Sequence, residues 1–460
     1  MLNNLEQTSA DPSGVPMALG QSSARTDFSR SQALQERSHQ LIPGGCHTYA
    51  KGDDQFPVLA PGFIARGSGC HVWDLDGNEY IEYGMGCRAV TLGHGFEPVV
   101  RAAQEEMLRG ANFSRPSPIE VHCAEELLGM IDGAEMVKFC KDGSSATTAA
   151  LKLARAHTRR DKVAFCIDHP FFATNDWFIG STPFDAGIPQ AIKDLSLTFR
   201  YNDIDSVRAL FENHPGEIAS LIMEPAKYAD PEDNFLHKVQ DLCHENGAVF
   251  ILDEMITGFR WHNGGGQEYY DIVPDLSTFG KALANGFSVS ALAGKRELME
   301  LGGLLHDQER VFLLSTTHGA ETHSLAAAIA TMQVYQAQPV IETLFRQGQR
   351  LREGIDASIA AHQLTDYLEV IGKPCCLVLA SRDQDKQPSQ AFRTLMLQET
   401  IRRGVLMLSL VTSYSHSDDD IDHTINAIDE SLDVYKKALD EGVEKYLVGR
   451  PSKSVYRKFN

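Results

Sequence analysis

Short apolar runs alternate with helical patterns through the middle of the chain, from about residue 121 to residue 291. These runs have the length of buried strands and are too short for buried helices. Strands that alternate with helices form parallel sheets, in which ligands bind at the carboxyl ends of the strands. We therefore predict an α/β domain with a mostly parallel sheet. Its strands are expected at residues 137–139, 162–166, 220–223 and 248–252.

The remaining segments predict a second, smaller domain. Residues 1–30 are polar and lack the apolar core of a signal peptide, so we interpret them as a flexible N-terminal tail. A β-meander is expected over residues 63–83, because a strong hairpin turn at Asp76-Gly77-Asn78 lies between two strand patterns. The predicted divisions are 31–95 for the N-terminal segment of the small domain, 96–330 for the large domain, 331–440 for the C-terminal small α+β domain, and 441–460 for a C-terminal tail.

The overall charge argues against two classes of partner. The chain of 460 residues has a net charge of −20, whereas nucleic acids and anionic membranes attract basic surfaces. No apolar run approaches the ~20 residues that span a bilayer. The nine cysteines show no spacing typical of a zinc site, so we predict no metal and expect reduced thiols in a cytoplasmic protein.

Lys281 and Asp253 are the candidate catalytic residues. Residues 250–254 predict a buried strand that ends in carboxylates, and Lys281 lies on a loop after the next strand. Pyridoxal phosphate (PLP) chemistry needs this pair, because the lysine forms a Schiff base and the carboxylate keeps the pyridine nitrogen protonated. Small and apolar neighbours favour a buried lysine with a lowered pKa. From these local residues alone, an ordinary surface lysine is an equal alternative.

Two stretches also fit nucleotide-binding motifs in part. A strand that ends in Asp253-Glu254 also fits the Walker B strand of an ATPase, but no Walker A loop accompanies it, which argues against an ATPase. Residues 84–89 fit a dinucleotide-binding pattern, but no long helix follows directly. We interpret this glycine-rich loop as one wall of a substrate site.

Other residues are candidates for binding. The turn Gly143-Ser144-Ser145 before a predicted helix at 146–158 suits a phosphate, with an ordinary helix N-cap as the alternative. Arg88 suits a substrate carboxylate, with a structural ion pair as an equal alternative. Tyr49 is a further substrate candidate, and Gly264-Gly265-Gly266 is expected to be a mobile turn.

Five stretches in order resemble the class III (ω-type) aminotransferases of PLP fold type I, and within them the glutamate-1-semialdehyde aminomutase-like branch. The match runs from about residue 42 to about residue 432. It implies a large domain with a mostly parallel sheet and a smaller α+β domain built from both chain ends. The stretches are residues 73–78, 142–146, 223–225, 252–260 and 274–282.

The resemblance assigns a role to each matching residue. Lys281 matches the Schiff-base lysine that also carries protons, and Asp253 matches the partner of the pyridine nitrogen. Thr317 matches a threonine that reaches the phosphate of the other subunit, which implies a homodimer with shared active sites. The other predicted cofactor-binding residues are Gly143 and Ser144 at the phosphate, Phe171 stacked on the ring, Met255 packed under it, and Glu224.

Departures from the family pattern bear on the reaction. The stretch 180–189 looks shorter than the gating loop that retains the intermediate of the aminomutase. We therefore predict a ping-pong aminotransferase with an amino acid donor, for which L-glutamate is a candidate. Its acceptor is a ketone or aldehyde, with a keto-sugar or a biosynthetic intermediate suggested by analogy. The alternatives are a true aminomutase and a PLP-binding protein without turnover.

Overall fold

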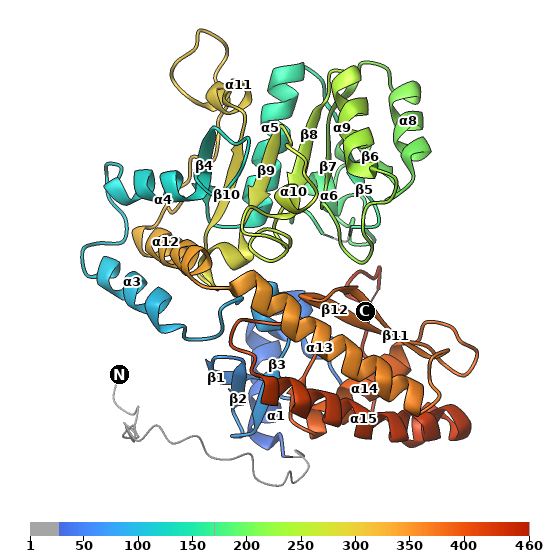
Figure 1. Ribbon diagram of the computed structural model, residues 1–460. Helices are drawn as coiled ribbons and strands as arrows, with labels where there is room; N and C mark the ends of the chain where they lie inside the picture. Colours follow the sequence, from blue (N-terminus) through green and yellow to red (C-terminus); the bar gives the residue numbers. More distant parts are fainter. Residues whose placement is uncertain (1–26, 170, 460) are drawn as a thin grey trace.

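A seven-stranded sheet forms the centre of the larger domain, in the upper half of Figure 1. The computed structural model describes residues 27–169 and 171–459. Strands β5 to β9 run parallel to their neighbours, whereas β10 is antiparallel to both β9 and β4. The sheet order is β4 (Met136–Cys140), β10 (Ser290–Gly294), β9 (Leu276–Phe279), β8 (Val249–Asp253), β7 (Ile218–Met223), β5 (Lys162–Cys166) and β6 (Ser196–Phe199).

Helices cover both faces of this sheet. One face packs on α5, and the opposite face packs on α8 and α9. Because both faces are covered, every residue of β7 and β8 is buried, which explains their uninterrupted apolar character. The predicted mostly parallel α/β domain is confirmed. Its helices are α3 (Glu97–Met107), α4 (Pro118–Leu128), α5 (Gly143–Thr158), α6 (Asp176–Ile179), α7 (Gln190–Lys193), α8 (Ile204–Asn213), α9 (Phe235–Glu245), α10 (Gly266–Tyr269), α11 (Arg296–Met299) and α12 (Thr322–Ala337).

The smaller domain, in the lower half of Figure 1, combines segments from both parts of the chain. Its four-stranded sheet joins three N-terminal strands to one C-terminal strand, β13, which pairs in parallel with β3. The fold-type prediction of a smaller α+β domain built from both chain ends is therefore confirmed. Its elements are α1 (Ser29–Leu41), β1 (Ile64–Ser68), β2 (His71–Asp74), β3 (Glu79–Glu82), α13 (Val340–Ala361), β11 (Leu368–Lys373), β12 (Cys376–Ser381), α14 (Gln390–Arg402), β13 (Val405–Leu406) and α15 (Asp418–Glu441).

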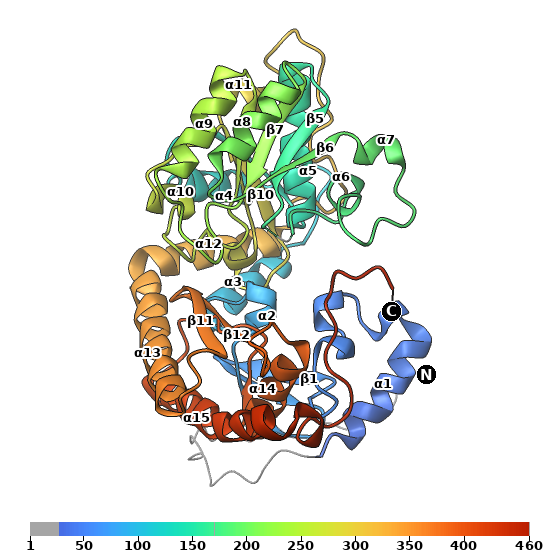
Figure 2. The same cartoon turned by 90° about the vertical axis from the view of Figure 1, so that its right-hand side faces the viewer.

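The C-terminal segment runs back beside the N-terminal part of the chain, as Figure 2 shows. The Lys453 amide donates a hydrogen bond to the Asp54 carbonyl at 2.8 Å, and Arg450 donates to the Asp53 carbonyl at 2.8 Å. These contacts attach residues 450–457 to the start of the smaller domain. Residues 1–26, most of the predicted N-terminal tail, lie outside the described residues.

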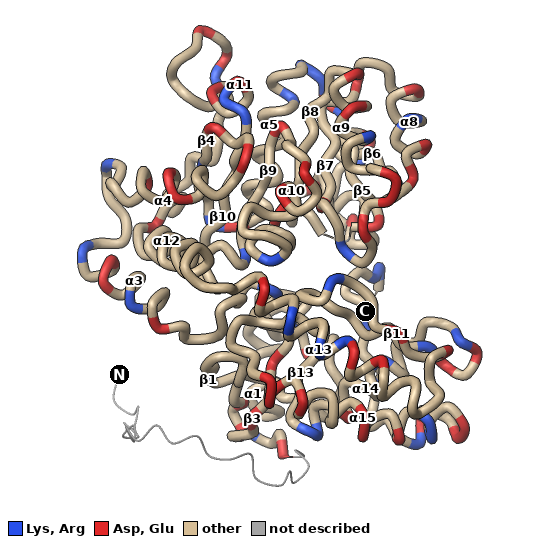
Figure 3. The backbone as a smooth tube through the Cα atoms, viewed as in Figure 1, with Lys and Arg blue, Asp and Glu red and all other residues tan. Residues whose placement is uncertain are grey.

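Charged residues of both signs are distributed over the two domains in Figure 3. Lys and Arg positions also lie along the junction where the domains face each other. Among the described residues, none of the helices combines the length and the apolar character that crossing a bilayer requires.

A close backbone contact holds the β11–β12 hairpin against α13. A Cβ atom placed on Gly348 would lie 1.8 Å from the Pro374 carbonyl oxygen in the hairpin turn. The Gly348 position and the Pro374 carbonyl both belong to the backbone, so neither can move away by a side-chain rotation. Only glycine therefore fits at this crossing.

Gly348→Ala should destabilise the protein by about 1–3 kcal/mol, because overpacking against backbone forces the helix and the hairpin apart. Urea denaturation measures the loss. Gly354→Ala in the same helix is the matched control, since its Cβ would meet only the side chain of Ile425. Equal stability of the two variants would contradict the close backbone contact.

Candidate cofactor and substrate site

Asp253 and Lys281 lie at the ends of neighbouring strands. Asp253 is the last residue of β8, and Lys281 follows β9 after a single glycine. Asp253 pairs with Thr278 across the two parallel strands, and its Oδ1 accepts a hydrogen bond from the Thr278 hydroxyl at 3.0 Å. The Met255 amide donates to the same oxygen at 3.0 Å. The structure thus brings the two predicted catalytic residues to one edge of the sheet.

Burial shifts the pKa of both groups toward neutrality. Asp253 is 2% exposed, and burial raises its pKa to about 7, opposed by the positive charge of Lys281. Burial also lowers the pKa of Lys281 to about 8, against the opposing charges of Asp253 and Glu224. Lys281 has a φ of 48°, in the left-handed region that is costly for a residue with a side chain. An amine with this pKa keeps a reactive unprotonated fraction near pH 7.

Glu224 follows β7 and lies in the same cluster of charges. It is buried, and its Oε1 accepts a hydrogen bond from Lys227 at 2.9 Å, while its Oε2 is buried without a hydrogen-bond partner. Burial would raise the pKa of Glu224, but the charge of Lys227 brings that pKa below its usual value. Sequence reasoning missed Lys227, because no motif distinguishes it from a surface lysine.

The first turn of α5 has the features of a phosphate site. The Asp142 side chain caps the helix by accepting a hydrogen bond from the Ser145 amide at 2.8 Å. The predicted helix was wrong by three residues at its start, because Gly143, Ser144 and Ser145 already form its first turn. The amides of Gly143 and Ser144 lack partners within the helix and lie at the positive end of its dipole. Ser144 Oγ accepts from the Thr174 amide at 3.0 Å, which connects the turn to the segment after Phe171.

Met255 fills the space between the phosphate turn and the lysine. A Cβ atom on Gly143 would lie 2.8 Å from Met255 Sδ, and one on Gly280 would lie 2.6 Å from the same sulfur. Met255 therefore packs closely against the backbone at both glycines. Met255 thus lies between the predicted phosphate-binding turn at Gly143 and the predicted Schiff-base lysine, Lys281.

The glycine-rich loop at residues 84–89 is held by a buried arginine. Arg260 donates hydrogen bonds to the Arg88 carbonyl at 2.6 Å and to the Thr91 hydroxyl at 3.2 Å. Arg88 itself has a φ of 69°, and its Nε is buried without a hydrogen-bond partner. Its guanidinium lies within electrostatic range of Glu224 and Lys281 but forms no ion pair with any described carboxylate. Burial would lower the pKa of Arg88, but its contact with the Cys376 side chain and the nearby Tyr228 and Glu224 raise it above the usual value.

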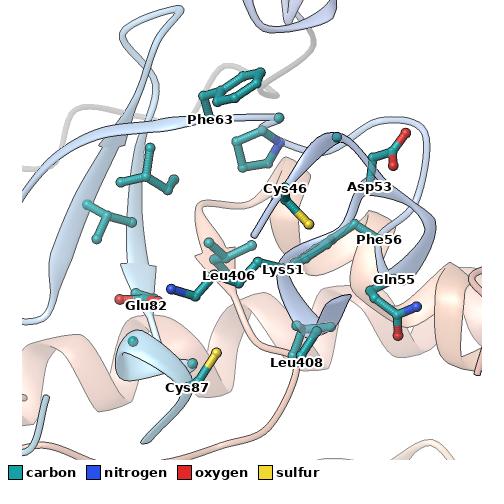
Figure 4. A pocket seen from close by; sticks show the side chains of 18 of the residues that line it. Cys46, Lys51, Asp53, Gln55, Phe56, Phe63, Glu82, Cys87, Leu406 and Leu408 are labelled. Carbon is teal, nitrogen blue, oxygen red and sulfur yellow. The ribbon is translucent and has the colours of Figure 1, made fainter. Parts of the chain in front are cut away.

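A cavity of about 600 Å³ opens on the smaller-domain side of this loop (Figure 4). Most of its wall is apolar, from residues such as Phe56, Phe63 and Leu408. Glu82, Lys51 and Arg88 bring charge to it, and Glu82 pairs with His94 at 2.6 Å. The volume lies in the range of sites for drug-sized ligands.

Three predicted site residues lie at the surface of the single chain. Phe171 is 46% exposed and contacts Phe178 edge-to-face, with ring centroids 5.7 Å apart. Tyr49 is 62% exposed and lies 5.8 Å from the Phe184 ring. Thr317 is exposed, and its carbonyl accepts a hydrogen bond from Asn112 at 3.0 Å. Their roles toward cofactor and substrate stay predictions.

The expected mobile turn at residues 264–266 is wrong. These glycines are buried, and the amides of Gly266 and Gln267 donate to the Glu254 carboxylate at 2.8 and 2.6 Å. Burial raises the pKa of Glu254 to about 7, partly offset by these hydrogen bonds. A Cβ on Gly265 would lie 2.8 Å from Glu254 Oε2, so the glycines permit the backbone to wrap the carboxylate. Three adjacent glycines after a strand-end glutamate are the sequence signal for this arrangement.

Comparison with known proteins gives the family. The model of the aminotransferase class-III family matches residues 48–432. Glutamate-1-semialdehyde 2,1-aminomutase from Acetivibrio thermocellus is 32% identical over 427 residues, covering 87% of this chain and 97% of the relative. The enzyme of that name from Alkaliphilus oremlandii is also 32% identical, covering 89% and 99%. The structure of the Sphingopyxis sp. MTA144 FumI protein in its PLP internal aldimine form has a TM-score of 0.82 and 28% identity, covering 90% of this chain and 98% of that one.

The chain belongs to the class III aminotransferases, and the predicted resemblance is confirmed. Its cofactor is pyridoxal phosphate, as predicted, and the residues present fit that group. The open first turn of α5 suits the phosphate, Asp253 suits a protonated ring nitrogen, and Lys281 suits the carbonyl. The protein is therefore an enzyme of amino-group chemistry.

The raised pKa of Asp253 predicts a pH dependence of stability in the cofactor-free protein. The folded state binds this proton up to about pH 7, whereas the unfolded state releases it near the ordinary value of 3.8. Stability should therefore fall as the pH rises through this window. Asp253→Asn should give a shallower fall, because the variant lacks this proton-binding group while Glu254 and the other titrating groups are unchanged.

Urea denaturation at several pH values between about 4 and 8 measures this difference. Added PLP should remove much of the wild-type slope, because a protonated ring nitrogen would stabilise the Asp253 carboxylate. PLP should leave the slope of the Asn variant as it is. Equal slopes for the two cofactor-free proteins would contradict the assignment.

Proposed function

We propose that the protein is a two-substrate aminotransferase that takes its amino group from a carboxylate-bearing donor, with L-glutamate as the first candidate. The observation that carries the proposal is Arg88, whose guanidinium lies near Lys281 without a carboxylate partner among the described residues. The Cys376 side chain hydrogen-bonds to Arg88 but is no carboxylate, so a donor carboxylate would give the guanidinium a bidentate charged partner.

The chain's own residues account for the chemistry expected here. When bound, PLP supplies a carbonyl that exchanges for an amino group and a ring that accepts electrons. The Lys281 amine, with a pKa of about 8, acts first as nucleophile and then as the base and acid that moves a proton. Asp253 holds the proton on the ring nitrogen, because its carboxylate faces the site from the end of β8.

The cavity beside Arg88 supports an acceptor larger than an amino acid. Its volume of about 600 Å³ and its mostly apolar wall suit an acceptor ketone or aldehyde with an extended body. A keto-sugar is less well matched, since sugars are bound by polar groups. Free exchange of two substrates also fits the short stretch at 180–189, which the Lys193–Asp185 ion pair at 2.6 Å holds beside α7.

The alternative is a glutamate-1-semialdehyde 2,1-aminomutase, which is the name that both relatives carry. An aminomutase needs to retain its intermediate, whereas a large cavity and a short gating stretch favour release. A PLP-binding protein without turnover is the third possibility, and the lowered pKa of Lys281 counts against it.

The proposal includes a cytoplasmic homodimer. The exposed positions of Thr317 and Phe171 suit residues that a second subunit would cover. All nine cysteines are free in the structure, which suits a reducing compartment. Sedimentation analysis tests the dimer directly.

L-Glutamate should bleach the visible absorption band of the PLP-loaded protein and release one equivalent of 2-oxoglutarate. Lys281→Ala should lack the band and the single-turnover reaction, because no other amine occupies its place at the end of β9. Absorption spectra and product analysis measure both. Isomerisation of glutamate-1-semialdehyde at an enzymatic rate, without a second substrate, would instead establish the aminomutase.

Arg88→Met should lower kcat/KM for carboxylate-bearing donors by about 10- to 100-fold, because a charged hydrogen bond contributes about 1.5–3 kcal/mol. Steady-state kinetics should show little change for a primary amine that lacks a carboxylate. Arg66→Met is the matched control, because it makes the same change at an arginine that instead stacks on the Trp73 ring at 3.5 Å. Equal losses for both classes of donor would make Arg88 a structural residue.

A further inference from the structure

A salt bridge joins the two domains close to the active site. Lys373, the last residue of β11, places its ammonium nitrogen 2.7 Å from Asp230 Oδ1 and 2.8 Å from Oδ2. Asp230 belongs to the irregular segment 224–234, which connects β7 to α9 in the larger domain and is called the β7–α9 segment below. Both oxygens of one carboxylate therefore contact one ammonium group across the domain junction.

Aromatic residues of the larger domain surround this ion pair. The Tyr270 hydroxyl donates a hydrogen bond to Asp230 Oδ1 at 2.6 Å. Lys373 donates to the Tyr269 hydroxyl at 3.3 Å and lies 4.8 Å from the centre of that ring. The Lys373 side chain is only 16% exposed, although that of Asp230 is 57% exposed. These contacts define one position for the ammonium group.

The Lys373 end of the pair is rigid. Cys375 and Cys376, which follow Lys373 after Pro374, belong to the buried cluster that contains Phe259 and Tyr335 of the larger domain. The turn between them and Lys373 is pressed against α13 at Gly348. In contrast, the β7–α9 segment contains no helix or strand of its own. The salt bridge therefore adds a restraint against the hairpin to the segment, whose backbone Asn202 also holds at Asp230 and Glu232.

The same segment supplies the charges that surround Lys281. Glu224 and Lys227 form their 2.9 Å pair within it, and both act electrostatically on Lys281. Tyr228, two residues before Asp230, lies within electrostatic range of Arg88. A displacement at Asp230 would consequently move the groups that face the lysine and the candidate carboxylate site.

We propose that Lys373 is a positioning residue, which holds the β7–α9 segment through Asp230 so that Glu224 and Lys227 keep their places beside Lys281. The inference rests on the proposed aminotransferase function for its kinetic consequence. The restraint of the β7–α9 segment itself needs no substrate and is a property of the unreacted protein. The smaller domain, which carries Lys373, thereby takes part in arranging a site on the larger one.

The test compares Lys373→Met with the wild type by hydrogen exchange and by steady-state kinetics. Amides of residues 226–230 should exchange faster in the variant, with and without PLP. The KM for the carboxylate donor should rise about tenfold, because Tyr228 of the segment lies near Arg88, and the pH profile of kcat should shift, because Glu224 and Lys227 act on Lys281. Lys373→Arg should restore both values, since it keeps the charge that pairs with Asp230.

Lys386→Met is the matched control. It removes a lysine that pairs with Asp366 at 2.7 Å within the smaller domain, away from the β7–α9 segment. Its exchange pattern and KM should equal those of the wild type. Unchanged exchange at residues 226–230 in Lys373→Met would overturn the restraint, and faster exchange with an unchanged KM would overturn the positioning role. Because exchange needs no substrate, it tests the restraint even if no donor reacts and the proposed function fails.

Discussion

The burial of Lys281 and Asp253 at the ends of adjacent strands is the constraint on which the site depends. Removing an amine and a carboxylate from water brings the pKa of the amine to about 8 and that of the carboxylate to about 7. Only the parallel pairing of β8 with β9 places the two groups together at one sheet edge. The strain at Lys281, with its φ of 48°, is sustained by the fully buried residues that follow it.

Small residues allow the backbone to approach the large side chains of the site. Gly143 and Gly280 make room for Met255, and Gly265 makes room for the Glu254 carboxylate. These contacts join the phosphate turn, the lysine loop and the end of β8 into one unit. Beside this unit, Arg88 contacts the Cys376 side chain but forms no ion pair with a described carboxylate, and on this observation we propose it as the site for the donor carboxylate.

Much of the site was predictable because its residues follow strand ends. Asp253, Lys281 and the turn at Gly143 follow strands whose apolar runs are evident in the sequence. Lys227 and Lys373 were not predictable in this way, since each lies in a segment without a repeating pattern. Their partners, Glu224 and Asp230, are close in space through the fold of an irregular segment and through contact between domains.

The sequence by itself determined the class of fold and the family, and it predicted the reactive lysine and its carboxylate partner. These depend on periodicity, on strand length and on short motifs, all of which act over local stretches of chain. Only the tertiary structure decided the cavity beside Arg88, the wrapping of Glu254 by glycine amides and the salt bridge between the domains. Each of these joins residues far apart in the chain, and their distances follow from packing rather than from any local pattern.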